Sequence, residues 1–319
     1  MSAPKVWVTG ASGFVGEALI FRLLVRQKYT PVAAVRGATR LQGLCPVARF
    51  ELGASSAEQL SGIQVVVHAA ARVHVMHETA SDALAEFRRV NVDGTLQLAR
   101  SAAQAGVKRF VYISSIKVNG ESTSSGRPFT ANDIPAPQDP YGISKHEAEQ
   151  ALRLLGCETG MEIVIIRPPL VYGPGVKANF LSLLRWLDKG MVLPLGAIRN
   201  QRSMVAIDNL LDLIEICLDH SAAAGQTFLV SDGDDLSTPR LLQRLASALG
   251  KNARLLPVPS TLLTLCATVL GKRAMAQRVC ESLQVDISKN RELLGWVPLI
   301  DVDTAMRRTA DHFLDTQKT

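Results

Sequence analysis

Short runs of apolar, β-branched residues alternate with longer amphipathic stretches over the first 170 positions of the chain. The short runs predict strands over 5–9, 31–36, 65–69, 110–114 and 162–167. The longer stretches predict helices, of which two cover 16–26 and 83–105, the second ended by Gly106. Strands buried on both faces and alternating with helices are typical of a parallel sheet with right-handed crossovers. We therefore predict an α/β fold with a doubly wound parallel sheet.

Beyond residue 170 the pattern changes to short elements that are interrupted by glycine and proline at 173–175, 190, 194–196 and 232–233. This texture predicts a smaller mixed α/β lobe over 171–319, packed beside a first domain over 1–170, with the binding cleft between them. The sequence contains no internal repeat and no low-complexity linker. We therefore expect the chain to cross between the lobes rather than form two independent units.

A glycine-rich turn, Thr9-Gly10-Ala11-Ser12-Gly13-Phe14-Val15-Gly16, joins the first predicted strand to the first predicted helix. Glycine permits the tight turn, lets the backbone approach a pyrophosphate and allows close helix–strand packing, while the helix N-terminus favours an anion. This context predicts a Rossmann-type dinucleotide site. Its expected residues are Gly10, Ser12, Gly13, Phe14, Val15 and Gly16. A purely structural strand-to-helix turn is the alternative.

The end of the second predicted strand bears on the choice between NAD and NADP. An acidic residue there holds the adenosine ribose of NAD, whereas an arginine accommodates the 2′-phosphate of NADP. Arg36 occupies this position, Arg40 follows it, and no carboxylate lies nearby, so the sequence favours NADP while leaving NAD open. Ala69 and Ala70 follow the third strand and are expected beside the cofactor. His68 is either a structural or a functional imidazole.

Tyr141 and Lys145 stand four residues apart on a predicted helix, so both project from one face. A tyrosine near its ordinary pKa of about 10 is a poor base at neutral pH. A neighbouring ammonium and a positive nicotinamide favour its phenolate, which could then exchange a proton with a substrate oxygen. Ser115, at the carboxyl end of a strand, can donate a hydrogen bond to that oxygen. We expect these three residues to be catalytic, with Tyr141 and Lys145 also contacting the cofactor.

Composition narrows the function classes further. The 319 residues are 47% apolar and 20% charged, which is typical of an ordered globular protein. The charge of +6 comes from 35 basic and 29 acidic residues without a basic run interleaved with aromatics, so no nucleic-acid partner is expected. Five cysteines without a close pair argue against a disulfide framework and a metal site.

Targeting signals are also absent from the pattern. A strand is predicted within four residues of the N-terminus, and no apolar stretch approaches the ~20 residues of a membrane span. We therefore expect a soluble, cytoplasmic protein without a transmembrane segment. The segment 262–270 is the most apolar. It predicts a buried or partner-facing helix, with peripheral membrane contact as the alternative.

The chain resembles the extended short-chain dehydrogenase/reductases, specifically the nucleotide-sugar epimerase/dehydratase family, over nearly its whole length. In the first 170 residues the resemblance rests on the glycine turn, His68-Ala69-Ala70-Ala71, Asn91-Val92-Asp93-Gly94-Thr95, Ser114-Ser115, and Tyr141 to Lys145. In the second lobe it rests on Arg167-Pro168, Tyr172-Gly173-Pro174-Gly175 and Leu294-Gly295-Trp296-Val297-Pro298.

This resemblance implies an NAD(P)-dependent enzyme that acts on a UDP-sugar. It implies a homodimer paired through the helices around 83–105 and 141–155. By position, the resemblance implies that Ser115, Tyr141 and Lys145 are catalytic. It implies that the glycine turn and Arg36 bind the cofactor. It implies that Ser115, Asn179, Arg202 and Arg278 bind the substrate. Arg273 is the alternative to Arg278 for the last of these positions. Arginine suits a diphosphate because its planar fork bonds bidentately.

The chain also departs from its relatives at four positions. Ile116 and Lys117 replace the Asp-Glu pair that family dehydratases need to eliminate water, which argues against a dehydratase. Asn119 replaces a tyrosine that many members carry, and we expect it to alter the rim of the sugar pocket. Val73 stands where some UDP-galactose-type epimerases carry a lysine.

Two reactions remain open after these exclusions. A UDP-sugar 4-epimerase of the UDP-glucose or UDP-GlcNAc type oxidises C4 and returns the hydride to the other face. An NAD(P)H-dependent reductase of a UDP-4-keto-6-deoxy-hexose, used in surface polysaccharide biosynthesis, reduces its substrate once. A non-catalytic, dinucleotide-binding regulator is the alternative from another class. The hexose and its N-acetylation stay open.

Overall fold

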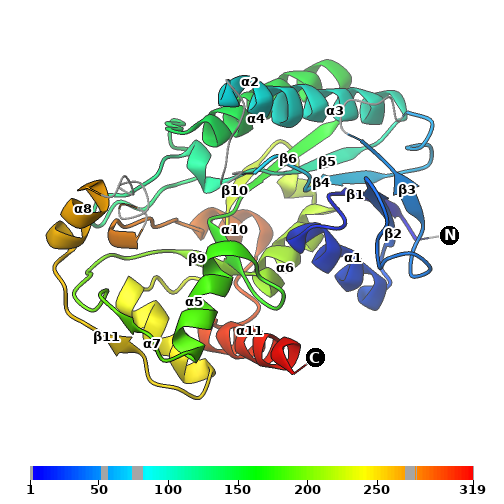
Figure 1. Cartoon of the computed structure of the whole chain (residues 1–319). Helices are drawn as coiled ribbons and strands as arrows, with labels where there is room; N and C mark the ends of the chain where they lie inside the picture. The colour runs from blue at the N-terminus through cyan, green and yellow to red at the C-terminus, as the bar shows by residue number, and fades with distance from the viewer. Residues whose placement is uncertain (1–2, 52–56, 74–81, 270–276, 278, 319) are drawn as a thin grey trace.

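Seven parallel strands form one sheet in the order β10-β6-β5-β4-β1-β2-β3 (Figure 1). The structure is a computed structural model that describes residues 3–51, 57–73, 82–269, 277 and 279–318. The strands are β1 (Lys5–Thr9), β2 (Thr30–Val35), β3 (Val47–Arg49), β4 (Val65–His68), β5 (Arg109–Ile113), β6 (Glu162–Arg167) and β10 (Thr227–Leu229). Strand order reverses at β1, as in doubly wound dinucleotide-binding sheets. The predicted α/β Rossmann-type fold is confirmed.

Helices cover both faces of this sheet because its strands are apolar on both faces. Val6 and Val8 point to one face and pack with α1 (Phe14–Arg26) and α6 (Ile207–Cys217). Trp7, between them, points to the other face and packs with α3 (Gly94–Gln104) and α4 (Pro140–Thr159). The period of two along β1 therefore divides the core into two layers.

The helix predicted over 83–105 is present as three consecutive segments rather than one regular helix. They are α2 (Ala83–Arg88), the π-helical turn η1 (Arg89–Asp93) and α3, and the chain leaves the helix at Gly106 with a φ of +77°. A π-helical turn inserted in a helix often marks a functional position. Here it carries Asn91, which is buried.

The second lobe has its own core. In it α5 (Ala178–Asp188), α7 (Thr238–Ala248) and α11 (Val302–Gln317) pack together. Two parallel strand pairs join β7 (Leu170–Tyr172) with β9 (Met204–Ala206), and β8 (Val192–Leu193) with β11 (Arg254–Leu255). The other elements among the described residues are η2 (Ile116–Val118), η3 (Ser221–Ala223), α8 (Ser260–Val269) and α10 (Ser288–Leu294). No side chain of α8 is buried, so the expectation of a buried helix at 262–270 is wrong for its described part, 262–269, and contact with a partner or a membrane stays a prediction.

The chain crosses from the second lobe back into the sheet. β10 pairs with β6, and α6 packs on α1, although both elements follow residue 170. The first 170 residues alone therefore do not contain the whole sheet domain. In the part of the chain that the structure describes, no helix has the length and apolar character needed to cross a bilayer.

Candidate active site

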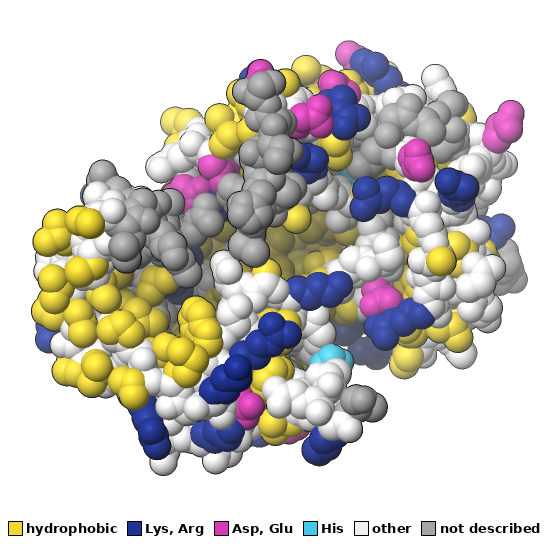
Figure 2. All heavy atoms as spheres, in the orientation of Figure 1, with side chains coloured by type: hydrophobic (Ala, Val, Ile, Leu, Met, Phe, Trp, Pro, Cys, Tyr) yellow, Lys and Arg dark blue, Asp and Glu magenta, His cyan; other side chains and the backbone are white. Residues whose placement is uncertain are grey.

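The expected site residues gather where the parallel strands end at their carboxyl edge. The glycine turn follows β1, Ala69 and Ala70 follow β4, and Ser115 lies two residues beyond the end of β5. Ligands of doubly wound sheets bind at this edge, beside the point where strand order reverses. Figure 2 shows the molecule hollowed between the sheet domain and the second lobe, with hydrophobic side chains in the depth of the hollow.

The glycine turn is shaped as a cradle that a side chain would fill. Gly10 has a φ of +66°, and a Cβ placed there would lie 2.8 Å from the backbone nitrogen of Ala70. A Cβ on Gly16 would lie 2.3 Å from the carbonyl oxygen of Gly10. Ser12 and Gly13 are exposed, and no side chain caps the start of α1, so its first amides can meet an anion. These residues fit the diphosphate of a dinucleotide.

Two arginines stand near the end of β2. Arg36 is exposed and follows the strand directly. Arg40 donates two hydrogen bonds to Glu17 of α1, with its Nε 2.6 Å from one carboxylate oxygen. That ion pair occupies Arg40, so Arg36 is the arginine of this pair better placed to meet an adenosine ribose.

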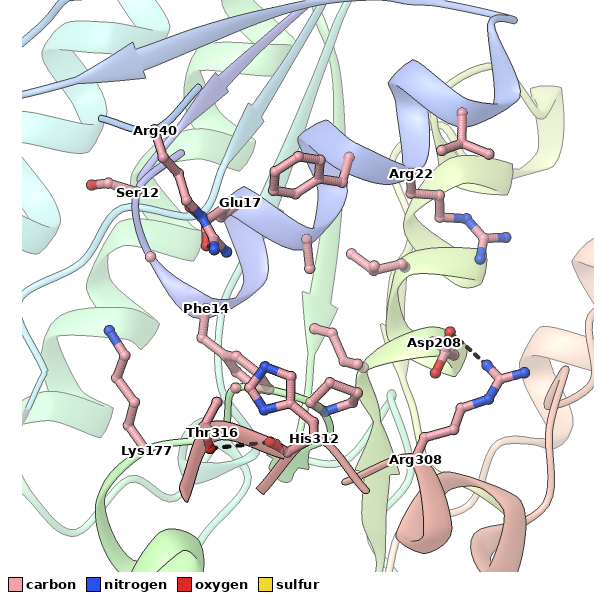
Figure 3. Close-up of a pocket in the computed structure, with 18 of the residues that line it drawn as sticks. Ser12, Phe14, Glu17, Arg22, Arg40, Lys177, Asp208, Arg308, His312 and Thr316 are labelled. Atoms are coloured by element: carbon pink, nitrogen blue, oxygen red, sulfur yellow. Dashed lines mark hydrogen bonds and ion pairs between the residues drawn. The ribbon is translucent and has the colours of Figure 1, made fainter. Parts of the chain in front are cut away.

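A cavity of about 1050 Å³ lies beside the glycine turn, lined by α1, α6, α11 and the loop before α5 (Figure 3). Ser12 of the turn lines it from one side and Lys177 from the other. In Figure 3 the Lys177 side chain extends from the second lobe toward the turn. The second lobe thus places a cationic side chain on the wall of the cavity beside the glycine turn.

The three residues expected to be catalytic, Ser115, Tyr141 and Lys145, converge at the start of α4. Asp139 caps this helix by accepting a hydrogen bond of 2.7 Å from the Gly142 amide, and Pro140 occupies its first turn. Tyr141 and Lys145 therefore share one face, and the Tyr141 hydroxyl hydrogen-bonds with the Ser115 side chain. Lys145 donates to the Ile113 carbonyl oxygen at 2.9 Å, with its Nζ 5.9 Å from the centre of the Tyr141 ring.

Burial is the largest influence on the protonation of Tyr141 and Lys145 in the ligand-free protein. Burial raises the pKa of Tyr141 well above its ordinary value near 10, Asp139 adds to the rise, and the Ser115 hydrogen bond opposes it. Burial also lowers the pKa of Lys145 to about 7, against the attraction of Glu149. Desolvation therefore outweighs the neighbouring charge in the ligand-free protein, and ionisation of Tyr141 beside a bound nicotinamide stays a prediction.

A buried polar network lies directly behind the trio and was not anticipated from the sequence. Glu149, one turn beyond Lys145 on α4, accepts a hydrogen bond from Ser114 at 2.5 Å and is paired with Arg167 through both carboxylate oxygens. Arg167 also donates to the side-chain oxygen of Asn119 at 2.9 Å. The Asn119 side chain is buried inside this network, and the expected effect of this position on the rim of the sugar pocket stays a prediction.

We expect Glu149→Gln to destabilise the fold strongly. The substitution leaves the Arg167 guanidinium buried without a counter-charge, which typically costs about 3 kcal/mol or more. Urea unfolding measures the loss. Glu86→Gln, which breaks the exposed pair with Arg89, is the matched control and should cost less than about 0.5 kcal/mol. Equal losses in both variants would show that burial does not govern the Glu149 pair.

His68 is a structural side chain in this arrangement. It lies buried at the end of β4, with Nδ1 2.7 Å from the Thr9 hydroxyl and Nε2 2.9 Å from the Thr95 hydroxyl. Its ring stacks on Tyr112 with centroids 5.7 Å apart. Burial, with a contribution from the charge of Lys145, lowers the pKa of His68 to about 3. The imidazole is therefore neutral at physiological pH.

The buried imidazole predicts a loss of stability in mild acid. Between the folded pKa of about 3 and the unfolded value near 6.5, only the unfolded chain binds the proton, so stability falls as pH falls. The His68 contribution amounts to roughly 2–3 kcal/mol by pH 4.5. Urea unfolding at pH 7 and pH 4.5 should show a smaller difference for His68→Gln, with His312→Gln at an exposed position as control. An unchanged difference in the His68 variant would contradict this assignment.

Asn91 is a further residue that the sequence analysis quoted without assigning a role. Its side-chain amide donates to the Ser144 hydroxyl at 3.0 Å and to the Arg72 carbonyl, and its oxygen accepts from the Arg72 amide at 2.8 Å. The π-helical turn directs the Asn91 side chain toward Arg72, in the segment that follows β4. Asn91 thereby ties the expected cofactor side of the site to α4.

The expected substrate residues lie on separate elements of the second lobe. Asn179 is exposed in the first turn of α5, directly after Ala178, which has a φ of +53°. Arg202 bridges to Leu236 and Leu283 through its backbone, and its guanidinium donates to the Glu281 carbonyl oxygen at 3.0 Å. Arg278 and Arg273 lie outside the described residues.

The structure shows the surroundings of three positions at which the chain departs from its relatives, Ile116, Lys117 and Val73. Ile116 is buried, and the ammonium of Lys117 is paired with Glu121 at 2.9 Å and with Asp139. Neither side chain can exchange a proton with a substrate as a carboxyl group would. Val73 is exposed after β4.

Comparisons with known proteins agree with this geometry. A model of the NAD dependent epimerase/dehydratase family matches residues 6–231. A UDP-glucose 4-epimerase of Vibrio cholerae is 47% identical, covering 98% of this chain and 96% of its own. An undecaprenyl-diphosphate-linked N-acetylglucosamine 4-epimerase of Escherichia coli O157:H7 is 26% identical, covering 89% of this chain and 88% of its own.

Solved structures share the fold. A UDP-glucuronic acid 4-epimerase of Bacillus cereus, in complex with UDP-glucuronic acid and NAD, superposes with a TM-score of 0.79 at 22% identity, covering 98% of this chain and 99% of its own. A UDP-glucose 4-epimerase of Thermotoga maritima with UDP-glucose gives a TM-score of 0.78 at 20% identity, with the same coverage. The Rossmann domain and its second lobe are thus an arrangement that these proteins have in common.

Proposed function

Because the chain belongs to the NAD-dependent epimerase/dehydratase family, we propose that it is a 4-epimerase of a UDP-hexose of the UDP-glucose or UDP-GlcNAc type. The observation that carries this proposal is the high identity to a UDP-glucose 4-epimerase along nearly the whole of both chains. The meeting of Ser115, Tyr141 and Lys145 beside the glycine turn supports it, because these residues supply what reversible oxidation of a hydroxyl needs.

The cofactor of the proposed reaction is NAD, the dinucleotide on which the family depends. The glycine turn would hold its diphosphate, and Arg36, Ala69 and Ala70 would flank the rest. A bound NAD would supply a reversible hydride acceptor for C4 of the sugar and a positive charge that favours ionisation of Tyr141.

In the proposed reaction, side chains of this protein transfer the proton and hold the sugar in position. Tyr141 takes the proton of the C4 hydroxyl as the hydride leaves and returns it as the hydride comes back. Ser115 donates a hydrogen bond to the same oxygen. Lys145, close to the Tyr141 ring, favours the phenolate once its own ammonium is charged.

Epimerisation also requires the sugar to turn over while the nucleotide stays bound. In the proposed complex Asn179, Arg202 and Arg278 hold the diphosphate and ribose, which leaves the hexose free to rotate. Dehydration is disfavoured because Ile116 and Lys117 offer no carboxyl group to remove water.

One experiment separates the proposed epimerase from its alternatives. The purified protein is denatured to identify the released nucleotide, and the native protein is incubated with UDP-glucose or UDP-GlcNAc without added cofactor. Net epimerisation with released NAD supports the proposal. Stoichiometric consumption of NADPH with a UDP-4-keto-6-deoxy-hexose would assign a reductase instead. Absence of turnover in either assay would leave the dinucleotide-binding regulator.

The setting of the enzyme is part of the same proposal. We propose a cytoplasmic homodimer that serves surface polysaccharide biosynthesis and pairs through α3 and α4. Their outer side includes Leu154, which is two-thirds exposed on α4 in the single chain. Light scattering of the purified protein tests the dimer, and a monomer at micromolar concentration would refute it.

A further inference from the structure

Lys117 lies between the two segments that supply Ser115 and Tyr141. It belongs to η2, which begins directly after Ser115. Its ammonium is paired with Asp139, the residue that caps α4 two positions before Tyr141. The Lys117 side chain is only 19% exposed, and an ion pair that is partly removed from water is screened less by salt than one on the open surface. Lys117 therefore contacts both sides of the candidate site.

The backbone of Lys117 acts on the Ser115 side of the site. Its amide donates a hydrogen bond of 3.3 Å to the Ser115 hydroxyl oxygen. Because that oxygen accepts from the amide, the hydroxyl hydrogen of Ser115 is left to donate to the Tyr141 oxygen or to a substrate oxygen. The Lys117 carbonyl oxygen lies against α4, since a Cβ placed on Gly142 would lie 2.9 Å from it. The turn after β5 and the start of α4 thus meet at Lys117.

The side chain of Lys117 acts on the Tyr141 side of the site. One carboxylate oxygen of Asp139 is paired with the Lys117 ammonium, and the other accepts from the Gly142 amide at 2.7 Å. Glu121 is a second partner of the ammonium, at 2.9 Å. A carboxylate that is held at both oxygens has a fixed orientation, and the first turn of α4 is fixed with it. Lys117 thereby connects the start of this helix to the segment that carries Ser115.

The Lys117 ammonium also offsets negative charge close to the phenol of Tyr141. The titratable groups that face this phenol lie on or next to two elements, and they are Asp139 before α4, Lys145 on α4 and Tyr112 on β5. Burial raises the pKa of Tyr141 most, and the charge of Asp139 raises it further. Because Asp139 is paired with Lys117, the ammonium reduces the negative charge that the phenol meets.

We propose that Lys117 is a positioning residue, which clamps the turn that carries Ser115 to the start of the helix that carries Tyr141. The clamp holds both hydroxyl groups where they can reach one substrate oxygen. The acidic residue that family dehydratases carry at this position would repel Asp139 instead. The catalytic consequence rests on the proposed proton transfer by Tyr141, but the clamp itself does not depend on which sugar is converted.

Lys117→Met tests the clamp, because it keeps an unbranched side chain and removes the charge. We expect kcat for a UDP-hexose to fall by roughly 10- to 100-fold with KM within about two-fold, since the reacting groups are displaced while substrate contacts remain. Without the ammonium, the charge of Asp139 raises the pKa of Tyr141 further. The ascending limb of kcat against pH should therefore move to higher pH by roughly one unit. Lys117→Arg, which keeps the charge, should restore both kcat and the limb.

Asp139→Asn separates the charge of this residue from its role as a helix cap, since asparagine caps a helix as well as aspartate does. Alone, it should move the ascending limb to lower pH. Combined with Lys117→Met, it should return the limb to within ~0.3 unit of its position in the unaltered protein. Lys108→Met is the matched control, because Lys108 is exposed directly before β5, at the end of the strand opposite Ser115. It should change neither kcat nor the limb.

Hydrogen exchange at the start of α4 tests the clamp independently of turnover. The amides of Gly142 and Ile143 both donate to Asp139. We expect Lys117→Met to accelerate their exchange at least ~10-fold and Lys108→Met to leave it unchanged. Accelerated exchange in a protein that converts no UDP-hexose would support the clamp and refute the proposed function alone. Unchanged exchange in Lys117→Met, or an unchanged pH profile in an active enzyme, would overturn the proposal.

Discussion

Tyr141→Phe is expected to lower turnover of a UDP-hexose by roughly 10³-fold, within the range for loss of a general acid–base group. The hydroxyl that meets Ser115 is the atom that receives the substrate proton in the proposed reaction. Phenylalanine keeps the ring against Phe87, whose centroid lies 6.1 Å away, so the fold and the cofactor site should persist. Initial rates at saturating substrate, with the bound nucleotide quantified, measure the effect.

A second tyrosine provides the control for this change. Tyr29 is buried just before β2, at the end of the parallel sheet opposite the candidate site. Tyr29→Phe should keep the turnover within about two-fold, since no acid–base step involves it. Turnover in Tyr141→Phe equal to that in Tyr29→Phe would refute the proposed proton transfer, whatever the net reaction proves to be.

Gly16→Ala is expected to eliminate most of the bound cofactor and to lower the melting temperature. The added Cβ would lie 2.3 Å from the oxygen and 2.7 Å from the carbon of the Gly10 carbonyl, which are backbone atoms fixed by β1. α1 must therefore move away from the turn, which separates its amides from the diphosphate. Overpacking of about 2 kcal/mol corresponds, for a chain of 319 residues, to a melting temperature lower by roughly 3 °C.

Gly37→Ala is the matched control for an added methyl group. A Cβ on Gly37 meets no atom within 4 Å, and its φ lies outside the left-handed region. Its melting temperature should equal that of the unaltered protein. Thermal unfolding and the nucleotide released on denaturation measure both variants. A Gly16→Ala protein with a full complement of cofactor would show that close contact of helix and strand is not required there.

The elements predicted from the sequence were those whose signal is local. The strands that form β1, β4 and β5 are continuous apolar runs, and the glycine turn is recognisable from eight consecutive residues, 9–16. The family resemblance rested on such motifs and is confirmed. The short strands β3, β8 and β11 escaped prediction because two or three residues carry no usable period.

The chemistry behind the trio escaped prediction for a different reason. Glu149 and Asn119 meet Arg167 only because three elements distant in sequence pack together. The rise in the Tyr141 pKa depends on how completely the phenol is removed from water, which the spacing to Lys145 does not reveal. The sequence spacing predicts that Tyr141 and Lys145 share one face of a helix, but their pKa values depend on how the folded chain packs around them.

The late position of β10 in the chain has a consequence for synthesis on the ribosome. Residues 5–167 supply six neighbouring strands, but the open edge of β6 gains its partner only when residues 227–229 emerge, some sixty residues later. An unpaired edge strand is a template for association with other chains. During that interval, we expect the nascent chain to depend on chaperones, which keep the β6 edge from pairing with another nascent chain on the same polysome.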